Sequence, residues 1–116
     1  MEIVVYKKEY DSSTSVDNFL DFYYGLQMKY LASELLPKGL SALQIAEAVL
    51  RAIKIGTSSG MEIREHFMPV FSDFNGEIIS DCKLSKLAYG LVLLNASPQL
   101  SVVGAWQVRV LKKFWN

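Results

Sequence analysis

The spacing of apolar residues changes along the chain, and each spacing is typical of one kind of element. Glu2 to Tyr6 contains three consecutive β-branched residues and predicts a short strand. From Val16 to Leu31 apolar residues recur at steps of three and four, which favours a helix beginning near Ser15, with Gly25 as a point of interruption. Pro37-Lys38-Gly39 ends this region, because proline lacks a backbone donor and glycine permits a left-handed turn.

A second helix is predicted from about Ala42 to Ile55. Ser41 and Gln44 have the spacing of a capping box, in which each side chain satisfies a free backbone N–H at the start of the helix. Gly56 is expected to end it. The spacing assigns its inward face to Leu43, Ala46, Val49, Leu50 and Ile53.

The middle of the chain predicts a β-hairpin. Met61 to Glu65 suits a short helical turn, and an extended segment from Phe67 to Phe71 follows. Asn75-Gly76 tolerates the positive φ angles of a type I′ turn, so Glu77 to Ser80 is expected to return antiparallel to the first strand.

Two further helices are predicted after the hairpin. Apolar residues from Leu84 to Leu94 predict an almost wholly buried helix. Ser97 suits an N-cap and Pro98 the first position of a last helix, which runs to the C-terminus. Its inward residues are expected to be Val102 or Val103, Trp106, Val110 and Phe114. The fold class is therefore α+β: one small domain over residues 1–116, mostly helical, with a short N-terminal strand and a central β-hairpin.

Composition agrees with one globular domain and predicts its compartment. The chain has 116 residues, of which 51% are hydrophobic, enough for a single core. Its longest apolar run, Leu91 to Leu94, is too short to cross a bilayer, and the first ten residues do not resemble a secretory signal. Cys82 is the single cysteine, so no intrachain disulfide can form and a cytoplasmic location is expected.

The residue types that carry enzymatic chemistry are sparse. His66 is the only histidine, and we interpret it as a residue at the start of a strand whose ring bonds backbone. A zinc site would need carboxylates for its other ligands, and none has a suitable spacing. Ser58-Ser59-Gly60 is a turn, since a P-loop needs more glycines and a lysine. Glu62 and Glu65 are interpreted as a solvated pair. We therefore expect a protein that is not an enzyme and that has no metal or cofactor.

Charge is balanced overall and unevenly placed. The formal net charge is zero, yet no acidic residue follows Asp81. Arg109, Lys112 and Lys113 share one side of the predicted last helix, where a row of cations can contact phosphates. The alternative is an ordinary solvated helix face with cations favourably placed near its C-terminus. The candidate nucleic-acid-binding residues are Lys83, Lys86, Arg109, Lys112 and Lys113. Trp115 is the candidate for contact with another chain, because not all aromatic residues can be buried in so small a domain.

A family resemblance covers about half of the chain. The residues that carry it are Arg51-Ala52-Ile53, Ser59-Gly60, His66-Phe67, Leu84-Ser85-Lys86, Asn95, Pro98, Val102-Val103 and Gln107. Together they resemble the N-terminal domain of the DNA-damage-inducible protein D family, which is related to the Bro-N domain of viral and phage antirepressors. Arg109 stands where the family usually has an aromatic residue, the hairpin is shorter, and the family's C-terminal half has no counterpart.

Two functions are expected from these observations. The first is a non-enzymatic, DNA-associated regulator linked to the DNA-damage response, recombination or phage antirepression, as the resemblance implies, acting through the basic C-terminal helix. The alternative is a protein-interaction module, alone or as a homodimer, that binds a DNA-acting or host protein without contacting DNA. Zero net charge favours the second, and the acid-free C-terminal third favours the first.

Overall fold

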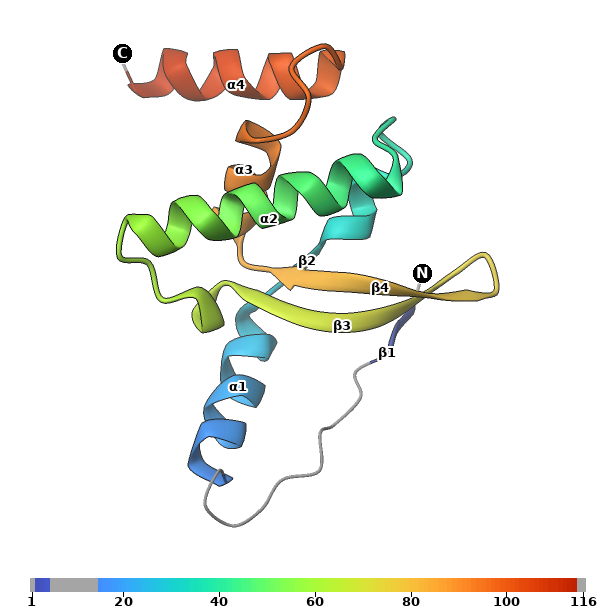
Figure 1. Ribbon diagram of the computed structural model, residues 1–116, viewed down its shortest axis with the longest axis vertical. Coiled ribbons are helices and arrows are strands. Elements are labelled where there is room, and N and C mark those ends of the chain that lie inside the picture. Colours follow the sequence, from blue (N-terminus) through green and yellow to red (C-terminus); the bar gives the residue numbers. More distant parts are fainter. Residues whose placement is uncertain (1, 5–14, 115–116) are drawn as a thin grey trace.

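The computed structural model describes residues 2–4 and 15–114 (Figure 1). The helices in these ranges are α1 (Ser15–Gln27), α2 (Ala42–Ser58), α3 (Lys86–Leu94) and α4 (Ser101–Phe114), with short 3-10 helices η2 (Ala32–Leu35) and η3 (Ile63–Glu65). The strands are β1 (Glu2–Val4), β2 (Tyr30–Leu31), β3 (Phe67–Phe74) and β4 (Glu77–Leu84). The fold class is α+β, as the sequence predicts. Val5 and Tyr6, which were expected to extend the first strand, lie outside the described residues.

The sheet is antiparallel and is built around the predicted hairpin. Its strand order is β1-β3-β4-β2, and β3 pairs with β4 from Phe67 opposite Leu84 to Phe74 opposite Glu77. Asn75 and Gly76 adopt φ angles of 54° and 84°, which is the positive region that a two-residue type I′ turn requires. The hairpin prediction is therefore confirmed, and each strand is longer than expected.

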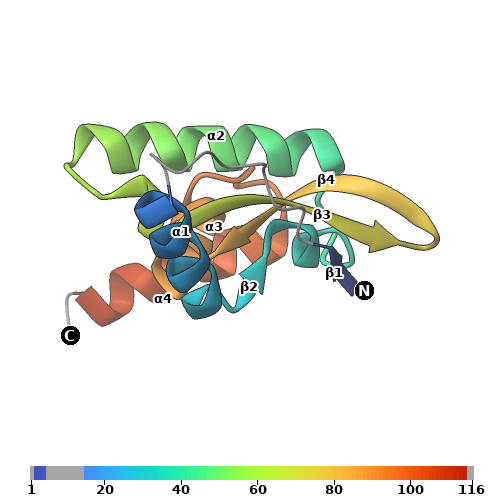
Figure 2. The ribbon, with the colours of Figure 1, turned by 90° about the horizontal axis from the view of Figure 1, so that it is seen from below.

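Helices α2 and α3 pack together beside one end of the hairpin, and α4 packs on α3 (Figures 1 and 2). Phe67 of β3 and Leu84 of β4 are buried in the hydrophobic core, and so is Val103 of α4. Trp106 Nε1 donates a hydrogen bond of 3.1 Å to the Gly90 carbonyl oxygen, which fixes α4 across α3. Helix α1 lies at the opposite end of the long axis from α4 (Figure 1).

Helix α2 begins as predicted but is longer and rotated. The Ser41–Gln44 capping box is present, with hydrogen bonds of 2.8 and 3.1 Å. Gly56 does not end the helix: it is buried inside it, and a Cβ there would lie 2.9 Å from Ile63 Cδ1. The buried stripe consists of Ile45, Ala48, Ala52 and Gly56. The predicted inward face was wrong for Leu43, Ala46 and Leu50, which are exposed, because small residues permit the closest approach of α3 and η3. Val49 and Ile53 of that face are half-buried and pack against the core, as predicted.

Helix α1 begins near Ser15 as predicted, and its end differs from the expectation. It passes through Gly25 without interruption and ends at Gln27. Tyr30 and Leu31 belong to strand β2, where they pair with Leu84 and Lys83. The helical spacing up to Leu31 was therefore misleading, because pairing with β4 decided the conformation there.

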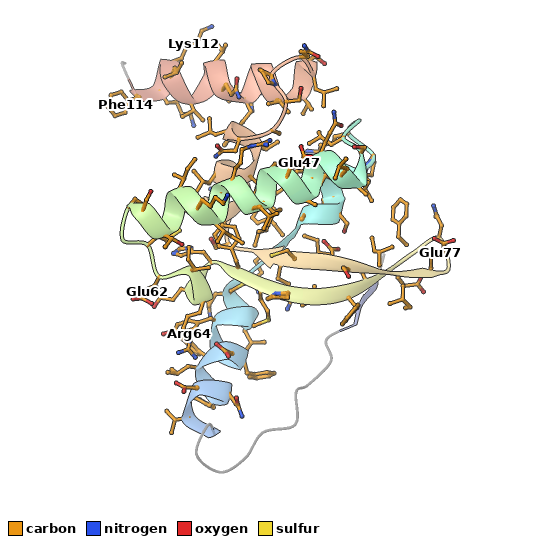
Figure 3. All side chains as sticks on the ribbon, in the orientation of Figure 1. Glu47, Glu62, Arg64, Glu77, Lys112 and Phe114 are labelled. Atoms are coloured by element: carbon orange, nitrogen blue, oxygen red, sulfur yellow. The ribbon has the colours of Figure 1, made fainter. Side chains whose placement is uncertain are left out.

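The last two helices differ from the prediction in three respects. Leu84 belongs to β4, and Leu87 on α3 is 58% exposed, so α3 is not wholly buried. Ser97 and Pro98 precede α4, since a hydrogen bond from Leu100 N to Ser97 O closes a separate turn before the helix starts. Phe114 is 76% exposed, because the end of α4 extends beyond α3 (Figure 3).

Candidate functional site

Helix α1 is held to the domain by its acidic side. Arg64 of η3 bonds Asp21 Oδ1 through Nε at 3.1 Å and Nη2 at 2.8 Å, and its Nη2 also donates to the Asp17 carbonyl oxygen at 2.9 Å. The hydrogen bonds that Arg64 donates to the Asp21 carboxylate raise the pKa of its guanidinium above the ordinary value. Gly25 lies against Met68, where its missing side chain leaves room for the methionine, and Lys83 Nζ donates to the Gly25 carbonyl oxygen at 3.3 Å. The polar face of α1 therefore points inward.

The ring of Tyr24 completes this attachment. The Arg64 guanidinium carbon lies 5.8 Å from the centre of the Tyr24 ring, a cation–π distance. Partial burial raises the pKa of the Tyr24 hydroxyl, and the neighbouring Glu65 carboxylate raises it further. The phenol therefore stays protonated and neutral at neutral pH beside these carboxylates.

The apolar side of α1 points to solvent. We call it the α1 face; its side chains are between 50% and 71% exposed. It consists of Val16, Phe19, Phe22, Tyr23 and Leu26. An amphipathic helix of a globular protein normally buries this side against the core. In α1 the acidic side faces the domain and the apolar side faces solvent, so the α1 face is accessible to another molecule. The apolar spacing alone does not predict this orientation, although Asp17 and Asp21, one turn apart opposite the aromatic residues, indicate a second attachment surface.

The five candidate basic residues occupy separate places. Arg109, Lys112 and Lys113 are all exposed on α4, and Lys112 points away from the rest of the domain (Figure 3). We call these three the basic face. In the described part of the chain none of the three forms an ion pair. Lys83 is bonded to Gly25 of α1, and Lys86 begins α3 at its sheet end, so neither extends the basic face (Figure 1). Trp115 lies outside the described residues.

His66 and Ser85 form a structural pair at the junction of β4 and α3. His66 Nδ1 lies 2.7 Å from Ser85 Oγ, and Ser85 Oγ accepts a hydrogen bond of 3.0 Å from Ala88 N as the N-cap of α3. The His66 ring thus bonds a side-chain hydroxyl, where a backbone partner was expected. This geometry supports the helix cap. Among residues 2–4 and 15–114 no group of three or more His, Cys, Asp or Glu side chains is placed to hold a metal ion.

Two residues of the family resemblance join the helices. Arg51 of α2 and Gln107 of α4 donate to the carbonyl oxygens of Asn95 and Leu94 at the end of α3, at 2.7 and 3.0 Å for the shortest contacts. These carbonyls have no partner within the helix itself. Helix capping therefore accounts for Arg51 and Gln107 in this pattern.

The carboxylate of Asp81 gathers a polar cluster that sequence analysis missed. Its oxygens accept from Ser72 Oγ at 2.6 Å, Ser33 N at 3.0 Å and Cys82 N at 2.8 Å, and also from Ser33 Oγ. Ser33 and Ser72 are buried. Four donors use the acceptor capacity of a carboxylate, so Asp81 ties η2 to the sheet and has no site left for a ligand.

An apolar groove lies beside this cluster, between α2 and the outer edge of β4. Its volume is about 320 Å³. Ala46, Val49 and Leu50 line one wall, and Ile79 to Cys82 line the other, with Ser33 and Leu36 at one end. Burial raises the pKa of the Cys82 thiol to about 11, and Asp81 adds to the shift, while a backbone hydrogen bond from Met68 opposes it. The thiol is therefore neutral at physiological pH and a weak nucleophile.

Comparison of the chain with family models, with curated proteins and with solved structures gives no match. The resemblance to the DNA-damage-inducible protein D family stays a prediction from sequence. Within the described ranges, no helix combines the length and apolar character that crossing a membrane requires.

Proposed function

We propose that this chain is a non-enzymatic protein-interaction module that associates with a second copy through the α1 face. The observation that carries the proposal is the inverted orientation of α1. Its acids are engaged by Arg64, while Phe19 and Phe22 are 66% and 60% exposed. Large contiguous apolar patches on a protein surface are uncommon unless a partner covers them.

Estimated areas favour a modest affinity. Large aromatic side chains each offer roughly 150–250 Å², so the α1 face exposes on the order of 500 Å² of apolar surface. Two such faces together bury about 1,000 Å², close to the lower limit of specific interfaces. At about 25 cal/mol per Å² this gives a gross gain of about 25 kcal/mol, and association entropy and side-chain ordering offset much of it. A concentration-dependent dimer is therefore expected.

Sedimentation velocity over a concentration series tests this proposal. Phe19→Ser with Phe22→Ser should shift the protein to monomer, because each hydroxyl would be buried without a partner at the interface. Leu43→Ser is the matched control, since Leu43 is 67% exposed on α2, away from α1. A wild-type protein that stays monomeric at all concentrations, or a double variant that associates like the control, would reject self-association through the α1 face.

A second candidate function is DNA association through the basic face. The observation that favours it is that Arg109, Lys112 and Lys113 lie together on α4, the helix at one end of the molecule (Figure 1). The sequences of α3 and α4 contain no acidic residue. Cations in such a row neutralise phosphates and release condensed counterions. The corresponding function is that of a DNA-associated regulator.

A salt titration of DNA binding tests the second candidate. If the basic face contacts phosphates, Lys112→Ala with Lys113→Ala should flatten the log–log salt slope by up to about 1.8, about 0.9 for each contact. Base preference should hardly change, because phosphate contacts position a protein and do not specify sequence. Lys54→Ala, an exposed lysine on α2, is the control. An unchanged slope in the double variant would leave only the interaction module.

A further inference from the structure

Strand β4 has an open edge beside the groove. It pairs with β3 along its whole length, whereas β2 covers only Lys83 and Leu84 on the other side. The outer edge from Glu77 to Cys82 therefore has no strand partner among the described residues. An edge of this kind presents backbone donors and acceptors to any extended chain.

The register decides which backbone groups point outward. The two-residue loop makes Phe74 and Glu77 a hydrogen-bonded pair, and such pairs alternate along the ladder. Pro69, which has no N–H, stands opposite Cys82, as a non-bonded pair requires. The N–H and C=O groups of Ile78 and Ser80 therefore point away from β3. The backbone groups of Leu84 also point away from β3, and Leu84 is a residue with which β2 pairs.

The backbone N–H of Cys82 also points away from β3, but it is already hydrogen-bonded, which shortens the free edge. Cys82 N donates to Asp81 Oδ1 at 2.8 Å. Helix η2 closes the edge at this point, because Ser33 also bonds Asp81. Two residues, Ile78 and Ser80, thus offer four backbone groups toward the open end of the groove, which suffices for a short added strand.

The wall of the groove suits the side chains of such a strand. Ala42, Ala46, Val49 and Leu50 of α2 run alongside the β4 edge. Successive side chains of a strand point to opposite sides, so every second side chain of an added strand would enter the 320 Å³ groove. Leu50 is 60% exposed, and an apolar side chain seated there would cover it.

Charge at the hairpin tip indicates the chemistry of the partner. Asp73 and Glu77 flank the turn, and the chain from His66 to Cys82 contains no lysine or arginine. Figure 3 shows Glu77 at the tip, and both ribbon views show the tip extending past α2 (Figures 1 and 2). A second copy fits poorly, because antiparallel pairing of Ile78 with Ser80 of another β4 would set Glu77 opposite a second Asp81. Like charges directly opposite are destabilising.

We propose that the groove between α2 and β4 binds an extended peptide segment of another protein as an added strand. The segment pairs with Ile78 and Ser80, places alternate apolar side chains against Val49 and Leu50, and carries a lysine or arginine beside Glu77. This site is separate from the α1 face, so it extends the proposed interaction module to a second, chemically different partner.

Two synthetic peptides test the site on the full chain. Each is acetylated and amidated, alternates valine and threonine over six residues, and carries two lysines at one end; the two peptides differ in which end. Binding is measured by fluorescence anisotropy and by amide chemical shifts. An added strand pairs with β4 in one preferred direction, and in that direction only one of the two peptides brings its lysines to Glu77. That peptide should bind more tightly than the other. The Ile78 and Ser80 amides should shift on binding. Failure of both peptides to bind at millimolar concentration would overturn the proposal.

Variants at the groove make the result specific. Leu50→Lys should weaken binding about tenfold or more, because it places a charge in the apolar wall. Leu43→Lys should not weaken binding, because Leu43 is similarly exposed on α2 but lies outside the groove. Glu77→Lys should reverse the preference between the two peptides, whereas Glu62→Lys should leave it unchanged. Equal weakening by Leu50→Lys and Leu43→Lys would contradict the site.

The α1 face gives an independent control. Phe19→Ser with Phe22→Ser should abolish self-association and leave peptide affinity unchanged, so each proposal can fail alone. If Leu50→Lys instead dissociates a dimer of the wild-type chain, a second copy occupies the groove and the peptide proposal is wrong.

Discussion

Arg51 on α2 donates two hydrogen bonds, from Nε at 3.0 Å and from Nη2 at 2.7 Å, to the carbonyl oxygen of Asn95 just beyond α3. The bonds join two helices that are 44 residues apart in sequence at this point. They also satisfy a carbonyl that the end of a helix leaves without a partner. Arg51 is thus a structural residue, although it belongs to the family resemblance.

Arg51→Ala should lower the free energy of unfolding by about 1 kcal/mol. A hydrogen bond from a charged donor contributes about 1.5–3 kcal/mol when sheltered, and solvent screening reduces it here because the side chain is 49% exposed. Urea denaturation measures the change. Lys54→Ala on the same helix should have almost no effect, and equal losses for the two variants would contradict the capping role.

Asp81 predicts a contrast between two substitutions. Asp81→Ala should cost about 2–4 kcal/mol, because it removes the acceptor of the buried Ser33 and Ser72 hydroxyls. Asp81→Asn should cost less, since a hydroxyl can rotate to accept from the new amide. Thermal and chemical denaturation of the two variants tests the order. If asparagine is as damaging as alanine, the cluster depends on the negative charge.

Two glycines should respond to alanine with opposite signs. Gly76 has a φ of 84°, where an L-residue is strained by about 1–2 kcal/mol, so Gly76→Ala should destabilise the hairpin. Gly104 lies inside α4, and a Cβ there would meet only the Pro98 carbonyl oxygen at an ordinary 3.6 Å. Gly104→Ala should stabilise by about 0.5–1 kcal/mol. Urea denaturation midpoints measure both effects, provided that the m-value is unchanged. Equal destabilisation by the two substitutions would contradict the predicted opposite signs.

Cys82 predicts a pH dependence. Its pKa in the folded protein is about 11, against an ordinary value of 9.0, so the folded state favours the neutral thiol. This contribution to stability is complete below pH 9 and is lost as the pH rises toward 11, because the unfolded chain ionises first. Unfolding midpoints of wild type and Cys82→Ser should therefore converge over that range. A midpoint difference that stays constant from pH 8 to 11 would oppose the assignment.

The same thiol should be slow to react in the native protein. At pH 8 a disulfide reagent such as Ellman's should modify Cys82 at least tenfold more slowly in buffer than in denaturant, because only the thiolate attacks. Reagent access also falls, since the residue packs against the core. Equal rates in the two conditions would show that the thiol is exposed and ionises normally.

The sequence predicted those elements whose cause is local. The Ser41–Gln44 capping box and the Asn75-Gly76 turn depend on residues within three positions of each other, and both have the expected geometry. The grouping of Arg109, Lys112 and Lys113 also follows from helical spacing alone, so this part of the candidate site was available in advance.

Only the tertiary structure decided which apolar side of each helix is covered. In α2 the spacing of large residues predicted that Leu43 and Leu50 would be buried. The buried residues are instead small ones such as Ala48 and Ala52, because close helix packing needs short side chains. In α1 the attachment through Arg64, 43 residues after Asp21, turned the aromatic side to solvent. Periodicity reports that a helix has an apolar side, whereas the position of distant partners determines whether that side becomes core or surface.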